Sequence, residues 1–197
     1  MELRWLGGRS VRLSGQKARV LMDPNPPVGS AGAESAGLVT YSLAAPERCG
    51  RRPDGSFVIA GAGEYEVDEI FVIGVTGGAA DGSNTLYNVN IDGVNVVHPG
   101  AAAQRLSQAQ VEELGAVDVL VLPLGDAGQG GPKAADWIAQ LQPAIVVPLS
   151  SGDDPAGQLQ RFLSGIGASA GETRDALQVQ AGSLPEDMQA VMLRSVS

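Results

Sequence analysis

The residue types best suited to catalysis are scarce in this chain, which has one histidine and one cysteine among 197 residues. The histidine, His98, ends an apolar run and precedes Pro99-Gly100. As a general base it would need a partner to orient it, and the sequence alone places none of Asp118, Asp126 and Glu64 beside it. We therefore expect a histidine packed in a polar pocket, with a general base as the alternative.

The cysteine, Cys49, lies between Arg48 and Gly50-Arg51-Arg52. Nearby guanidinium groups favour the thiolate, which is the reactive form. Without an identified histidine partner, however, a passive thiol is the expected state. A lone cysteine also forms no intrachain disulfide, which suits a reducing compartment.

The same scarcity bears on metal binding. A catalytic zinc needs about three protein ligands and a structural zinc about four, mostly His, Cys and carboxylates. Because the chain has one histidine and one cysteine, a metal site here would depend on carboxylates, which suit Mg²⁺ or Ca²⁺ better. We expect no metal ligands and no cofactor in this chain.

Two glycine-rich segments stand out. Gly61–Val67 predicts a glycine turn leading into a strand, with Glu64 and Glu66 on one face and Tyr65 and Val67 on the other. We expect a structural or interface role for it. The segment 124–133 could bind phosphate through backbone amides and Lys133, but it lacks the P-loop spacing, and an ordinary loop is expected.

The elements that must position these residues change in character along the chain. Short alternating or apolar runs predict strands as far as His98, and Asp92-Gly93 predicts a tight hairpin turn. Helical spacing then alternates with apolar runs, with Ser107, Pro132 and Asp153 or Asp154 at the helix starts. The predicted strands are Glu2–Leu6, Val11–Leu13, Ala18–Met22, Leu38–Ser42, Phe57–Ala60, Glu69–Val75, Thr85–Ile91, Val94–His98, Val117–Pro123, Ala144–Leu149, Leu177–Val179 and Ala190–Leu193. This order favours an α/β protein in which a pair of mixed sheets has helices outside, in one domain over 1–197.

Charge and hydropathy limit the partners. The formal net charge is −9, which disfavours nucleic acid and anionic membrane surfaces. Met1–Gly7 lacks the apolar run of a signal peptide, and no run approaches the 18 or so apolar residues of a membrane span. We expect a cytoplasmic protein. Strand edges such as Glu69–Val75 are candidates for pairing between copies in a homo-oligomer, and the sequence identifies no small-molecule ligand.

Several motifs in order resemble the metallo-β-lactamase superfamily, in particular its lactonase-like branch. The resemblance covers nearly the whole chain and implies an αββα four-layer sandwich with a two-metal site between its sheets. The motifs are Trp5–Ser10, Leu21–Pro24, Leu38–Ser42, Gly61–Val67, Asn84–Tyr87, Ile91–Gly93, His98–Gly100, Val117–Pro123, Gln142–Leu149 and Ser183–Glu186.

The metal ligands that this resemblance implies are missing from the sequence. The family signature His-x-His-x-Asp-His matches Leu43-Ala44-Ala45-Pro46-Glu47-Arg48, which contains no histidine. Gly8, Ala101 and Ser150 stand where the family often has a histidine, the bridging aspartate and the late histidine. Residues 74–83, where a further family histidine is expected, contain none, and an arginine would repel a dication.

Three functions are consistent with these observations. The first is a catalytically inactive member of the family that acts as a binding or assembly protein. The second is a hydrolase of esterase, lactonase or phosphodiesterase type with an altered site, for which His98, Glu47 and Glu64, together with Asp23, are the candidate residues. The third is a phosphate or nucleotide binder that uses residues 124–133.

Overall fold

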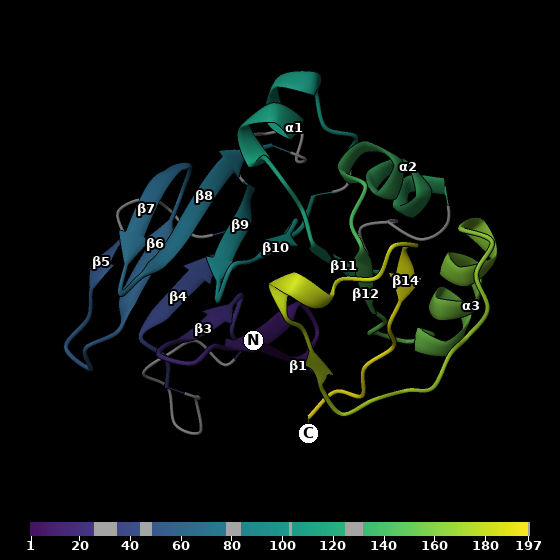
Figure 1. The fold of residues 1–197 in the computed structure, drawn as a ribbon, viewed down its shortest axis with the longest axis horizontal. Helices are drawn as coiled ribbons and strands as arrows, with labels where there is room; N and C mark the ends of the chain where they lie inside the picture. Colours follow the sequence, from purple (N-terminus) through teal and green to yellow (C-terminus); the bar gives the residue numbers. More distant parts are fainter. Residues whose placement is uncertain (26–34, 44–48, 78–83, 103, 125–131, 197) are drawn as a thin grey trace.

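The computed structural model describes residues 1–25, 35–43, 49–77, 84–102, 104–124 and 132–196, without the side chains of 132 and 133. These residues form two seven-stranded sheets that pack face to face, and three α-helices (Figure 1). The pair of mixed sheets predicted from the sequence is confirmed. One domain over 1–197 stays a prediction.

Sheet A contains most of the N-terminal strands. Its order is β13 (Leu177–Gln178), β1 (Glu2–Gly7), β2 (Ser10–Ser14), β3 (Arg19–Met22), β4 (Leu38–Tyr41), β6 (Phe57–Ala60) and β5 (Gly50–Arg51). Strands β3, β4 and β6 run parallel, so their carboxyl ends all lie at the same end of the sandwich.

Sheet B has the order β14 (Gln189–Ala190), β12 (Ile145–Leu149), β11 (Val119–Pro123), β10 (Val94–His98), β9 (Thr85–Ile91), β8 (Ile70–Thr76) and β7 (Gly63–Val67). The predicted hairpin at Asp92-Gly93 is confirmed, because both residues have the positive φ of a type I′ turn, 52° and 76°. The expectation that Glu69–Val75 is a free edge is wrong, because β8 has β7 on one side and β9 on the other.

Three groups of buried apolar side chains hold the layers together. The largest fills the space between the sheets and is built mainly of Val, Leu and Ile, as the shortage of aromatic residues requires. A second lies between sheet B and the helices, and includes Trp137 and Phe162. A third, smaller group, centred on Leu21, Val39 and Val58, belongs to β3, β4 and β6 of sheet A.

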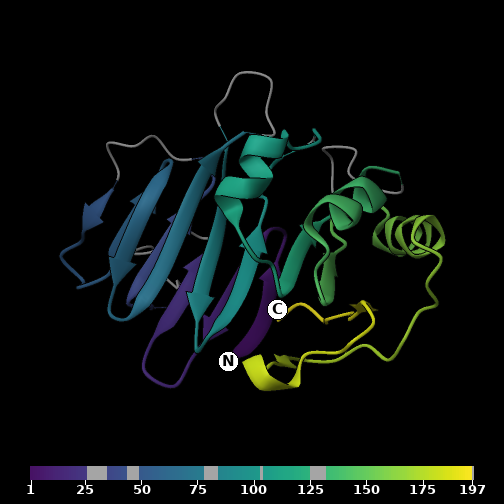
Figure 2. The same cartoon turned by 45° about the horizontal axis from the view of Figure 1, so that its top comes forward.

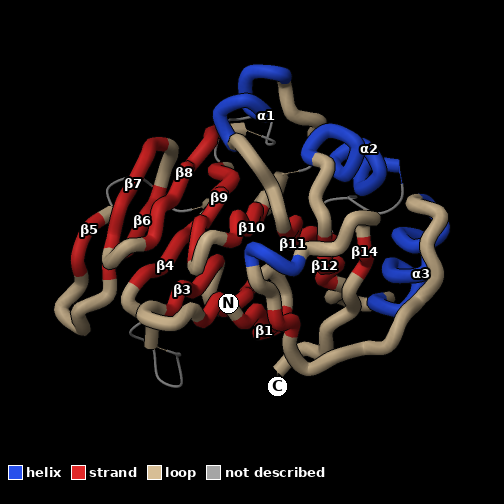
Figure 3. Tube along the Cα trace, viewed as in Figure 1, coloured by secondary structure: helices blue, strands red, loops and turns tan. Residues whose placement is uncertain are grey.

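The helices α1 (Gln108–Leu114), α2 (Pro132–Leu141) and α3 (Pro155–Gly165) pack beside sheet B (Figures 2 and 3). Ser107 caps α1 by accepting a hydrogen bond from the Gln110 amide, and Asp154 caps α3 through the Gly157 amide. A single turn of 3₁₀ helix spans Ala181–Ser183. None of the helices in the described ranges is long and apolar enough to span a membrane.

Candidate functional site

Polar side chains from both sheets meet at one end of the sandwich. Asp23 follows β3, Ser42 follows β4 and His98 ends β10. In open α/β sheets the carboxyl ends of parallel strands are where ligands usually bind. A ligand site is therefore expected at this end, which we call the junction.

His98 is fully engaged by backbone groups. Its Nε2 lies 2.8 Å from the Arg9 carbonyl oxygen, and its Nδ1 accepts a hydrogen bond of 3.0 Å from the Gly100 amide. A carbonyl can only accept and an amide can only donate, so Nε2 carries the proton and Nδ1 does not. The ring is 1% exposed, and burial lowers the pKa of His98 against the opposing attraction of Asp23. His98 is thus a neutral imidazole without a free nitrogen.

Asp23 is the carboxylate nearest to His98, with Oδ2 3.9 Å from Nδ1. This distance is too long for a hydrogen bond. The carboxylate instead accepts two bonds of 2.6 Å from Ser42, one from its amide and one from its hydroxyl. Arg9 Nε lies 3.9 Å from Oδ2. Asp23 therefore fixes the end of β4 against the end of β3 and does not orient the histidine.

Asn84, just before β9, ties the neighbouring loops together. Its side-chain amide donates to the carbonyls of Gly77 and Pro99, at 2.9 and 3.0 Å, and its oxygen accepts from the Ala101 amide at 2.8 Å. The side chain is fully buried and completely paired. It holds the loop after β10 in a closed position.

Gly100 shows how tightly that loop closes. Its φ is +64°, and a Cβ built on it would lie 2.3 Å from the Ser42 Cβ and 2.6 Å from the Asn84 Oδ1. Both the backbone conformation and the lack of space therefore require glycine here. The space between the strand ends at this position is filled by protein atoms.

Tyr87 joins the sheets beside this loop. On β9 it lies opposite His98 of β10. Its hydroxyl accepts a hydrogen bond of 2.9 Å from the amide of Gly61, which lies between β6 of sheet A and β7 of sheet B. The hydroxyl also lies 3.3 Å from the Tyr41 carbonyl. Burial raises the pKa of Tyr87 well above its usual range, so the phenol stays protonated and serves as a bridge between the sheets.

Among the candidate catalytic residues that the structure describes, His98 and Asp23 meet at the junction, whereas Glu64 and Asp118 lie elsewhere. Glu64 is exposed on β7, three strand spacings or about 14 Å from His98, on the opposite face of sheet B. Glu47 lies outside the described residues. Asp118 accepts hydrogen bonds from Asn95 at the other end of β10, and Asp126 lies outside the described residues.

The remaining candidates from the sequence, Cys49 and the segment 124–133, do not form a site within the described residues either. Cys49 is exposed and forms no disulfide. Residues 125–131 of the glycine-rich segment, and the Lys133 side chain, lie outside the described residues, so phosphate binding there stays a hypothesis. Sequence reasoning missed Asn84 and the pairing of Asp23 with Ser42. A polar residue directly before the strand Thr85–Ile91 was the available signal for Asn84.

Within the described residues, the donor set at the junction does not fit a metal ion. No group of three or more His, Cys, Asp or Glu side chains in the described part of the chain is placed to hold one. At the junction itself the donors are His98, whose Nδ1 lone pair is engaged by the Gly100 amide, and Asp23, whose two oxygens each accept a hydrogen bond from Ser42. Leu43, the first position of the family signature, is half exposed and apolar, and positions 44–48 lie outside the described residues.

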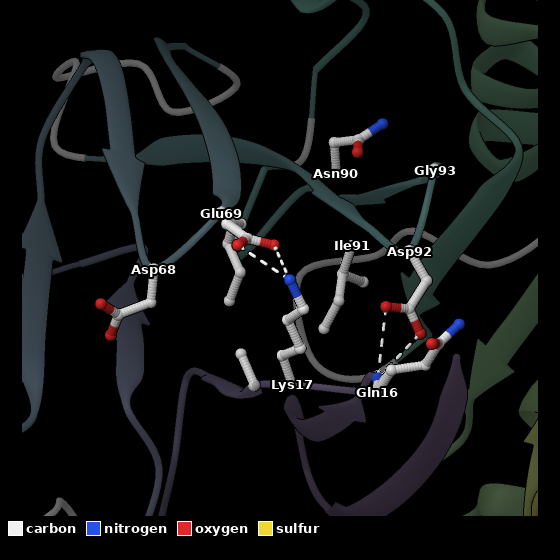
Figure 4. A pocket seen from close by; sticks show the side chains of 10 residues that line it. Gln16, Lys17, Asp68, Glu69, Asn90, Ile91, Asp92 and Gly93 are labelled. Atoms are coloured by element: carbon white, nitrogen blue, oxygen red, sulfur yellow. Dashed lines mark hydrogen bonds and ion pairs between the residues drawn. The ribbon is translucent and has the colours of Figure 1, made fainter.

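A second polar region lies at the opposite end of the sandwich, where three turns meet (Figure 4). We call it the turn end. Lys17 Nζ, between β2 and β3, contacts both carboxylate oxygens of Glu69, between β7 and β8, at 2.9 and 2.7 Å. Asp92, between β9 and β10, accepts from the Gln16 amide at 3.1 and 3.2 Å. These contacts flank a pocket of about 220 Å³.

Comparisons with known proteins agree with the fold. The family model described as a beta-lactamase superfamily domain matches residues 2–150. A search of curated proteins finds no match. Among solved structures, a provisionally assigned zinc-dependent hydrolase of the metallo-β-lactamase superfamily from Thermotoga maritima is similar over 98% of both chains, with a TM-score of 0.75 and 22% identity.

Two further solved structures are similar at lower identity. A provisionally assigned metal-dependent hydrolase from Parabacteroides distasonis has a TM-score of 0.62 and 14% identity, with 98% of this chain and 93% of that chain covered. The metallo-β-lactamase fold protein YhfI from Bacillus subtilis has a TM-score of 0.59 and 8% identity, with 98% and 96% covered. The α/β sandwich predicted from the sequence is confirmed.

Proposed function

The chain belongs to the β-lactamase superfamily, and on this premise we propose that it is a catalytically inactive member that acts as a binding or assembly protein. One observation carries the proposal: both ring nitrogens of His98, the single histidine, are engaged by the backbone of Arg9 and Gly100. A histidine in this state neither binds a metal nor accepts a proton from a substrate without breaking the junction.

The closed loop at Gly100 supports the same conclusion. A hydrolytic site needs room for a substrate carbonyl or phosphoryl group next to an activated water. At Gly100, Ser42 and Asn84 leave no room even for a Cβ atom. In this proposal the protein needs no zinc, and it acts in the cytoplasm on partners that are neither membrane surfaces nor nucleic acid.

Metal content is the first test. The protein is expressed with zinc, iron and manganese supplied, purified without chelators and subjected to elemental analysis. We expect less than about a tenth of an equivalent per chain, because the described donor set lacks the three ligands of a catalytic site. A parallel screen of ester, lactone and phosphodiester substrates should give no turnover above that of His98→Gln.

The opposite result would favour a hydrolase with an altered site. One or two metal equivalents that are lost in Glu47→Ala, Glu64→Ala or His98→Ala would contradict the inactive assignment. Turnover that persists without metal but is abolished in His98→Gln would contradict it as well. Thermal unfolding of each variant separates the loss of a ligand from the loss of the fold.

A further inference from the structure

Strand β7 is an open edge of sheet B. It pairs with β8 on one side, and within the described residues no strand pairs with its other side. Val67 and Ile70 flank the two-residue turn and form the hydrogen-bonded pair that closes such a hairpin. Because the backbone direction alternates along a strand, the N–H and C=O groups of Glu64 and Glu66 point away from β8. Four backbone groups are therefore directed outward along this edge.

The side chains of β7 alternate in the way predicted from the sequence. Glu64 and Glu66 are exposed, whereas Tyr65 and Val67 are half-buried and pack against the core between the sheets. Glu66 lies opposite Phe71 of β8, which is 41% exposed on the same outer face. The edge thus presents carboxylates outward and an apolar surface inward.

An open groove continues the inward surface of this edge. It has a volume of about 290 Å³ and lies between β7 and β5 and β6 of sheet A, so that the last described strand of each sheet contributes to it. The Arg51 guanidinium lies 6.0 Å from the centre of the Phe57 ring and forms one wall. The lining residues are Arg51, Phe57, Tyr65, Glu66, Val67 and Asp68.

We infer that the β7 edge binds an extended segment of another protein in which Lys or Arg alternates with apolar residues. The added strand satisfies the outward backbone groups of Glu64 and Glu66, as in other cases of strand addition to a sheet edge. Its basic side chains lie opposite the two glutamates, and its apolar side chains enter the groove against Phe57, Tyr65 and Val67. The alternation of β7 itself dictates the alternation of the partner.

A second copy of the chain fits this edge poorly. Two antiparallel β7 strands would bring the glutamates of one copy beside those of the other, and like charges directly opposite destabilise a strand pair. A net charge of −9 adds general repulsion between copies. The complementary occupant is therefore basic.

This inference names a partner for the binding role proposed above but uses a different edge of the molecule from the junction. The two are tested separately, because metal or turnover at the junction would leave the β7 edge unchanged. Conversely, failure to bind a peptide at β7 would leave the state of the junction unaffected.

The test measures binding of fluorescent peptides to the full chain by polarisation. The probe is a peptide of about nine residues with alternating Lys and Val, and the reference peptides carry Glu in place of Lys, or N-methyl groups on alternate backbone amides. We expect the Lys peptide to bind, the Glu peptide not to bind, and N-methylation to abolish binding, because it removes the ladder donors.

Charge reversal on the protein sharpens the test. Glu64→Lys/Glu66→Lys should weaken binding of the Lys peptide by at least about tenfold and give measurable binding of the Glu peptide. Glu172→Lys/Glu186→Lys, at two exposed glutamates before β13 and β14, makes the same change in net charge, is the matched control and should change neither. The inference is overturned if the Lys peptide does not bind, if the N-methylated peptide binds equally well, or if Glu172→Lys/Glu186→Lys weakens binding as much as reversal at β7.

Discussion

Polar side chains make contacts at both ends of the sandwich, in opposite surroundings. At the junction, His98, Asn84 and Tyr87 are each 1% exposed or less and make their contacts inside the protein. At the turn end, Lys17 and Glu69 are each 72% exposed and meet in solvent. The length of β10, about 17 Å, separates the two.

The difference lies in what replaces a lost contact. At the turn end, water takes the place of either partner, so the net contribution of the ion pair is small. At the junction, a lost partner leaves a buried donor or acceptor without any substitute, which costs about 1–3 kcal/mol for each group. The buried polar residues at the junction therefore contribute to the stability of the fold, as the inactive role proposed above expects.

The largest expected effect is at Asn84. Asn84→Ala removes three hydrogen bonds and leaves the carbonyls of Gly77 and Pro99 and the amide of Ala101 without their partner. We expect the free energy of unfolding in urea to fall by about 3 kcal/mol or more.

The matched control is Asn90→Ala on the same strand. Asn90 is half-buried and bonds to the Asn95 side chain at 2.9 Å, so its loss should cost less than about 1 kcal/mol. If the free energy of unfolding fell equally in the two variants, burial at the junction would contribute nothing extra, and the contrast between the two ends would fail.

The next effect is a dependence of stability on pH that belongs to His98. The unfolded chain takes up a proton near pH 6.5, whereas burial lowers the pKa of His98 in the folded state against the attraction of Asp23. The folded state therefore binds fewer protons below that pH. The contribution is complete above about pH 7.5, and the free energy of unfolding should fall by up to about 1.4 kcal/mol per pH unit as the pH drops below 6.5.

Urea unfolding between about pH 5.5 and 8 measures this slope, and His98→Gln supplies the baseline. Because the chain has one histidine, the slope difference between the two proteins is specific to this residue. Identical slopes would mean that His98 titrates as freely as in the unfolded chain, and that the junction is open to water.

The sequence predicted the sheets and helix starts well because these follow from local periodicity and capping. Ser107, Asp154 and the turn at Asp92-Gly93 are local signals, and each is confirmed. The alternation of Gly61–Val67 is confirmed for the same reason. The edge prediction for Glu69–Val75 was wrong, because strand order depends on contacts between segments distant in sequence.

The junction could be predicted only in part. That His98 is packed in a polar pocket followed from the lack of an evident partner, and the structure confirms it. Its two partners, however, are backbone groups of Arg9 and Gly100, and any residue type can supply a backbone group. No pattern of side chains encodes such a contact, so neither the tautomer of His98 nor the conformation of the loop at Gly100 could be predicted from the sequence.

The smallest expected effect is at the turn end. Lys17→Ala should lower the free energy of unfolding by about 0.5 kcal/mol or less, since both partners of the Lys17–Glu69 pair are largely exposed. Salt screens such pairs, so the difference from the parent protein should shrink further between about 0.05 and 0.5 M NaCl. Glu69→Ala and the double variant Lys17→Ala/Glu69→Ala complete a mutant cycle that isolates the pair from other effects. A coupling energy above about 1 kcal/mol that salt does not reduce would show that the exposed pair stabilises the fold as buried contacts do, and the contrast between the ends would fail.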